Sequence, residues 1–114
     1  MLIPAATTLD HLVRLTAPGA PVTPVIRALD EVQAGAAAAR PALVQAKASV
    51  WMLGEVDRIR GAAQTLRDSL AELQERDGMT SFDPAFAADD AAWDAWFTES
   101  AGILRIAAGI ANEV

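Results

Sequence analysis

Residues 42–76 read ALVQAKASVWMLGEVDRIRGAAQTLRDSLAELQER and decide the fold. Apolar residues recur in this segment at alternating steps of three and four, the spacing at which side chains share one face of a helix. A first run contains Leu43, Ala46, Val50 and Leu53, and a second run, one three-residue step later, contains Val56, Ile59, Ala63, Leu66, Leu70 and Leu73. We therefore predict one long, heptad-patterned helix over about 42–76, with a length of about 50 Å.

Two glycines lie inside this segment and leave an alternative open. A break at Gly54 or Gly61 would divide the helix in two. Continuity is favoured because each glycine stands among good helix formers and costs only about 1 kcal/mol relative to alanine. A continuous helix makes the molecule elongated.

Two helices are predicted before this segment. A short N-terminal helix over about 8–16 has Thr8 as a possible cap, and a second helix over about 24–40 follows a Thr-Pro start signal. The second helix is expected to end before Pro41, because proline lacks an amide hydrogen and disfavours the α conformation of the residue before it.

One further helix is predicted after the long one. Gly78 is a natural stop, and an Asp-Pro pair at 83–84 would start a single turn through residue 87. A C-terminal amphipathic helix follows over about 88–112. Since no strand alternation is present, residues 1–114 are predicted to form one all-α domain. Its architecture would be an elongated antiparallel bundle of three main helices plus the short N-terminal one.

The start of the C-terminal helix, DDAAWDAWF at residues 89–97, holds three aspartates and three large aromatics. A helical projection places the aromatics on one side and two of the aspartates on the other, with Asp89 at the helix start. One interpretation is that the aromatics pack on the long middle helix. The other is that helices of unequal length leave apolar surface bare, so that these residues bind a partner. The candidate partner-binding residues are Asp90, Trp93, Asp94, Trp96, Phe97 and Glu99.

The negative charge is concentrated in one quarter of the chain. Residues 77–104 contain six acids and no Lys or Arg, and the remainder holds nine acids and nine bases, so the formal charge of −6 lies in that quarter. Such a segment repels nucleic acid and anionic membranes and favours a basic partner. The simpler explanation is that acids gather at a helix start, where the helix dipole stabilises them.

The residue inventory argues against most chemistry. The chain has no cysteine and a single histidine, His11, and its seven glycines are scattered, so thiolate sites, common phosphate loops and a histidine-assisted nucleophile are all excluded. Asp90 and Asp94 lie one turn apart and could share a cation, but a solvated carboxylate pair is the commoner arrangement. We therefore expect no cofactor, no bound metal and no enzymatic activity.

Location is constrained by what the sequence lacks. The most apolar tract, residues 101–111, is interrupted by Arg105 and falls short of the roughly 20 residues that span a bilayer. The N-terminus has no basic region before an apolar stretch, so a secretory signal is not expected. These features and the lack of cysteine predict a protein of the cytoplasm, or of a particle assembled there.

Two classes of function follow. The first is a non-enzymatic interaction or assembly subunit, whose long helix is completed by copies of itself or by other proteins. The alternative is a small acidic inhibitor, such as an immunity or anti-defence protein, that blocks a basic surface. The heptad pattern favours the first. A bias toward alanine, with eight arginines against one lysine, is typical of a GC-rich bacterium or its phages. The sequence leaves the partner and the oligomeric state open.

Overall fold

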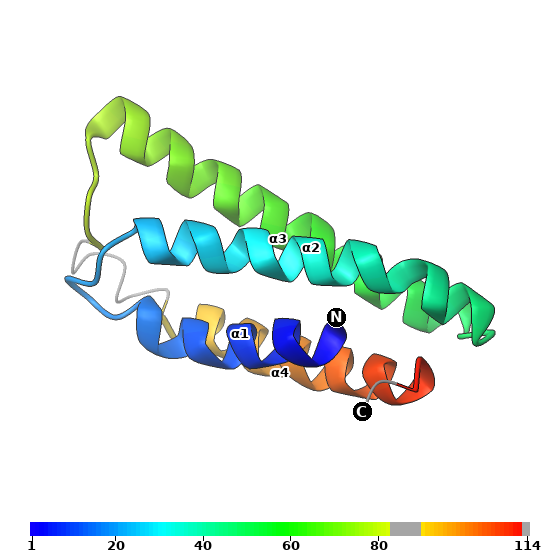
Figure 1. Ribbon diagram of the computed structural model, residues 1–114. Coiled ribbons are helices and arrows are strands. Elements are labelled where there is room, and N and C mark those ends of the chain that lie inside the picture. Colours follow the sequence, from blue (N-terminus) through cyan, green and yellow to red (C-terminus); the bar gives the residue numbers. More distant parts are fainter. Residues whose placement is uncertain (83–89, 113–114) are drawn as a thin grey trace.

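The computed structural model describes residues 1–82 and 90–112, and for residues 90 and 91 only the course of the backbone. Its helices are α1 (Leu2–Leu15), α2 (Thr23–Gln45), α3 (Val50–Asp77) and α4 (Asp90–Ile110). Successive helices run in opposite directions (Figure 1). Within the described ranges there is no β-strand, only a single bridge between Pro21 and Ser81. The all-α, antiparallel prediction is confirmed. The prediction of an elongated bundle of three main helices and a short one was wrong, because the four described helices pack into a compact fold with extents of 44 × 24 × 22 Å.

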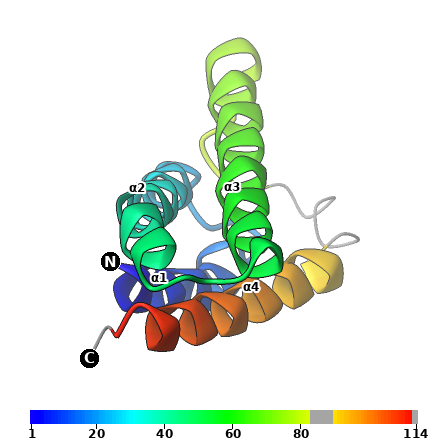
Figure 2. The same ribbon diagram turned by 90° about the vertical axis from the view of Figure 1, so that its right-hand side faces the viewer.

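The helices form two closely packed pairs, α1 with α4 and α2 with α3, joined mainly through α1 and α2. The helices α3 and α4 touch over a short stretch only, and α3 leans away from α4 toward its C-terminal end (Figure 2). The bundle is therefore closed on three sides and open on the fourth, between α3 and α4.

The N-terminal helix is longer than predicted. It spans 14 residues from Leu2 and buries Leu2, Leu9 and Leu12. Thr8 does not cap it: its Oγ1 donates to the Pro4 carbonyl (2.9 Å), one turn back. Pro4 lies in the first turn, where an amide hydrogen has no partner inside the helix, so proline does not interrupt it. The prediction of a short helix starting near residue 8 was wrong for this reason.

The boundary between the second and third helices was also predicted wrongly. α2 runs through Pro41 to Gln45, and α3 begins only at Val50. Leu43 is fully buried, and burying a leucine stabilises by roughly 1.5–3 kcal/mol, which offsets much of the roughly 3 kcal/mol that a helical proline costs. The change of helix lies inside the first apolar run, between Ala46 and Val50, so the described structure contains no single helix over 42–76.

A tight turn joins α2 to α3. The Ala48 amide donates to the Leu43 carbonyl and the Lys47 amide to the Val44 carbonyl (both 3.0 Å), the bond pattern of a Schellman motif. Lys47 occupies its left-handed position with a φ of 58°, where glycine is usual. Ser49 then caps α3, since its Oγ accepts from the Met52 amide (3.1 Å).

The third helix is continuous through both of its glycines and ends at Gly78, whose φ of 64° is left-handed. The second apolar run packs as expected, with Val56, Ile59, Ala63 and Leu70 buried. The first run does not, because Val50 is exposed and Met52 is the residue that turns inward.

Polar contacts join the helices of each pair. Arg40 pairs with Asp57 and Arg67 with Asp30 across α2 and α3, and Arg105 of α4 pairs with Asp10 of α1. The predicted cap Thr23 is instead the first residue of α2, and its Oγ1 accepts from Gln74 Nε2 (2.9 Å). These exposed contacts link facing positions of the paired helices, and each contributes at most about 1 kcal/mol.

Two further contacts complete the fold: the close approach of α1 to α2 at Gly35, and the contact of Phe82 with the loop before α2. A Cβ on Gly35 of α2 would lie 2.6 Å from the Met1 carbonyl oxygen, so glycine lets α1 pack tightly there. After α3, Phe82 exchanges backbone hydrogen bonds with the loop before α2: its amide donates to the Ala20 carbonyl (2.9 Å), and its carbonyl accepts from the Gly19 amide (2.8 Å). The Phe82 ring is buried and closes that end of the core.

Two sequence predictions concern residues outside the described ranges: the single turn after Pro84, and Asp89 as a helix cap. Along the described chain, no helix combines the length and the apolar character needed to cross a membrane.

Candidate functional site: the groove between α3 and α4

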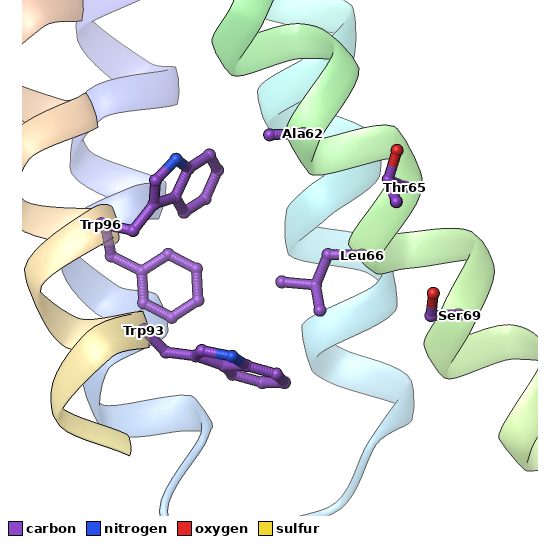
Figure 3. Close-up of a pocket in the computed structure, with 7 residues that line it drawn as sticks. Ala62, Thr65, Leu66, Ser69, Trp93 and Trp96 are labelled. Atoms are coloured by element: carbon purple, nitrogen blue, oxygen red, sulfur yellow. The ribbon is translucent and has the colours of Figure 1, made fainter. Parts of the chain in front are cut away.

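A groove with a volume of about 420 Å³ opens between α3 and α4. We call it the α3–α4 groove. It is lined by Ala62, Thr65, Leu66 and Ser69 of α3 and by Trp93, Trp96 and Phe97 of α4. Figure 3 shows the Trp93 and Trp96 side chains pointing from α4 toward α3, where Leu66 points back at them. The lining is mostly apolar, which is the usual character of a binding groove.

The aromatic wall combines core and surface. Phe97 is fully buried, whereas Trp93 and Trp96 are half-buried. Both indoles meet the Phe97 ring edge-on, with centroid distances of 6.4 Å for Trp93 and 5.5 Å for Trp96. Such edge-to-face contacts favour one orientation of each tryptophan by about 0.5–1.5 kcal/mol. The two predicted interpretations of this stripe therefore apply to different residues: Phe97 belongs to the core, and Trp93 and Trp96 line the groove.

The opposite wall comes from α3 and was not predicted from the sequence. Leu66 is half-buried, and Thr65 and Ser69 are exposed. Small side chains at these positions do not reach across to α4, so the space in front of the indoles stays open. A signal existed, because Ala62, Thr65 and Ser69 follow one another at steps of three and four outside the apolar stripe.

The acidic candidates do not act as one cluster. Asp90 is the first residue of α4, and its side chain lies outside the description. Asp94 is half-buried, and its Oδ1 is buried without a hydrogen-bond partner within the described structure. Glu99 is exposed and interacts electrostatically with Arg58 of α3. Of these three acids, Glu99 is the one that the structure places at the open side of the bundle.

A small charged cluster lies at the narrow end of the groove. Arg58 Nη2 donates to Glu55 Oε2 (2.7 Å), one turn earlier on α3. This hydrogen bond and the charges of Glu55 and Glu99 raise the pKa of Arg58 above its ordinary value. The guanidinium therefore stays charged in an environment of two carboxylates.

Exposed apolar residues lie beyond this cluster. Val50 is 87% exposed and Trp51 64% exposed in the first turn of α3, and Ile106 is 60% exposed on α4. Ile106 follows Glu99 by two helical turns, as Trp51 precedes Arg58 by two, and the helices are antiparallel. Trp51 and Ile106 therefore lie at the same end of the bundle, but Ile106 is about half a turn around α4 from the buried Phe97 and points away from the core.

The α3–α4 groove is lined by aromatic, aliphatic and hydroxyl side chains. Among the residues that the structure describes, no three His, Cys, Asp or Glu side chains come together as a metal site. His11 is exposed on α1, outside the groove lining. What the described face provides is fixed aromatic surface, small polar groups and a few charges, which are the components of a protein contact.

Comparison of the chain with protein-family models, with curated proteins and with solved structures gives no match.

Proposed function

We propose that this protein is a non-enzymatic interaction or assembly subunit, and that it binds protein through the open face between α3 and α4. The observation that carries the proposal is the pair of half-buried tryptophans, Trp93 and Trp96, held edge-on by a buried Phe97 beside an open groove. Tryptophan anchors of fixed orientation contribute strongly to protein interfaces because little side-chain entropy is lost on binding.

Two further features support a protein ligand. The groove continues along α3 into a second hollow, lined by Ser69, Glu72, Leu73, Arg76 and Asp77. A long, shallow face with an apolar centre and a charged rim suits a helix or a folded surface better than a compact small molecule.

The alternative is an acidic inhibitor that blocks a basic surface, and it has less support. Of its six acids, Asp83 and Asp89 lie outside the described residues, and the side chain of Asp90 is not described. Asp94 has a buried Oδ1, and Asp77 lines the second hollow along α3. Glu99 remains at the open face, but it already interacts with Arg58.

Site-specific photo-crosslinking tests the proposal. A photoreactive phenylalanine analogue is placed at Thr65, in the groove, and at Gln64, a matched control that is exposed on another side of the same helix turn. The full chain is produced in its source cell and irradiated. We expect protein adducts from position 65 and few or none from position 64, and mass spectrometry identifies what is attached.

A groove-blocking variant checks that the adducts need the face itself. Ser69→Arg puts a long charged side chain into the groove from an exposed helix position, so circular dichroism should be unchanged. Adducts from position 65 should then fall several-fold, whereas Gln64→Arg should leave them unchanged. Equal adduct yields at positions 64 and 65 would contradict the proposal.

A further inference from the structure

We propose that the partner of the open face is a second copy of this chain, and that each copy inserts Trp51 into the α3–α4 groove of the other. The assembly is a dimer with two-fold symmetry in which two α3 helices cross antiparallel. This inference rests on the proposed function, because it names the occupant of the same groove.

Trp51 lies on the same side of α3 as the residues that line the groove. Along α3, the residues on one line at steps of four, three, four, three and four are Trp51, Glu55, Arg58, Ala62, Thr65 and Ser69. This is the spacing of a seam along which two helices pack. It is distinct from the buried stripe that faces α2 and the core. One end of the seam is an exposed tryptophan, and the other end is the wall of the groove.

A two-fold axis requires a specific register of the two α3 helices. Trp51 and Thr65 are about 21 Å apart along the helix, and the residue midway between them is Arg58. An axis through Arg58 brings the partner copy's Trp51 opposite Thr65, at the groove, and the reverse contact forms at the same time.

Charged residues lie at the axis. Glu55 and Glu99 flank Arg58 within one copy. Rotation about the axis adds the partner copy's Glu55 and Glu99, so each guanidinium can be shared between carboxylates of both copies. The middle of the face carries charges of both signs, so a second copy can set its guanidinium against these carboxylates and its carboxylates against this guanidinium.

Two exposed glycines lie in the same part of α3. Gly54 and Gly61 are exposed in α3, and a Cβ at either would meet nothing within 4 Å. Packing within one copy therefore gives no reason for glycine at these positions, where it weakens the helix. In the proposed dimer they flank the crossing point of the two helices, where a small residue permits close approach.

The contact is modest in size. The overlapping stretch is about 22 Å long and two helices wide, which buries on the order of 1,000 Å² in total. This area lies at the low end of specific interfaces, so the dimer should form reversibly as concentration rises.

Sedimentation equilibrium of the purified full chain over a concentration series tests the inference. We expect a monomer–dimer equilibrium in which Trp51→Ala raises the dissociation constant by about tenfold or more, because it removes the anchor. Gly61→Gln should also weaken the dimer while raising the melting temperature measured at low concentration, because glutamine favours the helix. If Gly61 affected only the stability of the monomer, Gly61→Gln would raise the melting temperature and would not weaken the dimer. Gln64→Ala, outside the seam, should change neither.

Cross-linking tests the symmetry. The chain has no cysteine, so a single introduced cysteine is unique. With a bismaleimide of matching length, Ala62→Cys should link two copies efficiently, because the position lies on the seam and its two copies would be about 12 Å apart along the helices. Ser69→Cys should not, since the two copies of residue 69 would lie about 33 Å apart along the helices. Equal linking at both positions would overturn the two-fold arrangement.

The possible failures are distinguishable. A wild-type chain that stays monomeric at high concentration, but forms groove adducts with a different protein in the source cell, overturns this inference and leaves the proposed function standing. A monomer without groove adducts overturns both.

Discussion

At the scale of single residues, replacing glycine by alanine is expected to change the stability in opposite directions at two positions. Gly78→Ala should destabilise the protein by about 1 kcal/mol, because the φ of 64° strains any residue with a Cβ. Gly61→Ala should stabilise the monomer by roughly 0.5–1 kcal/mol, because Gly61 lies within a helix and a Cβ there is unobstructed. Urea unfolding at low protein concentration measures both. If the two substitutions change the free energy of unfolding in the same direction, the left-handed conformation of Gly78 at the end of α3 is contradicted.

Individual residues were predicted unevenly from the sequence. Gly78 was identified as a helix stop because its cause is local: glycine tolerates the left-handed conformation. The exposure of Trp93 and Trp96 could not be read from periodicity. A helical projection shows which side chains share a face, but how far a neighbouring helix covers them depends on where that helix leans.

At the scale of elements, the start of α3 depends on one hydroxyl. Ser49→Ala should cost about 1 kcal/mol, because the Met52 amide loses its acceptor at the helix N-terminus. Ser49→Asp should restore the stability, since a carboxylate accepts the same bond and suits the positive end of the helix dipole. Thermal unfolding by circular dichroism measures both variants. A neutral Ser49→Ala would mean that the turn alone positions α3.

The same turn explains the largest error in the predicted elements. The apolar spacing from Leu43 to Leu53 was compatible with a single helix, and Pro41 looked like a better boundary than Ser49. Tertiary burial of Leu43 favours a helical Pro41, and the turn at Lys47 lacks the glycine that usually marks it. A local pattern cannot show either effect.

At the scale of the whole molecule, the divergence of α3 from α4 has an energetic signature. Leu70 and Leu66 are one turn apart on α3, but Leu70 is buried and Leu66 lines the groove. Leu70→Ala should cost about 2–4 kcal/mol, as in a packed core, and Leu66→Ala only about 1 kcal/mol. Chemical denaturation at low protein concentration compares them. Similar losses would show that the groove is closed within one copy.

The helical class and the antiparallel order were predictable for the molecule as a whole, because apolar periodicity and short connections dictate them. The open side was foreseen only in general terms, as apolar surface left bare. Its position depends on how closely α1 packs on α4 and α2 on α3, and no segment of sequence carries that information alone.

The turn at Lys47 has a consequence for how the chain can be cut. Lys47 is the single lysine, and it is exposed. A lysine-specific protease therefore has one site, in a helix connection of the kind that proteases reach most readily. Cleavage gives residues 1–47, with α1 and α2, and residues 48–114, with α3 and α4. Since α1 packs on α4 and α2 on α3, each fragment completes both pairs of the other, and the nicked protein should remain one folded particle.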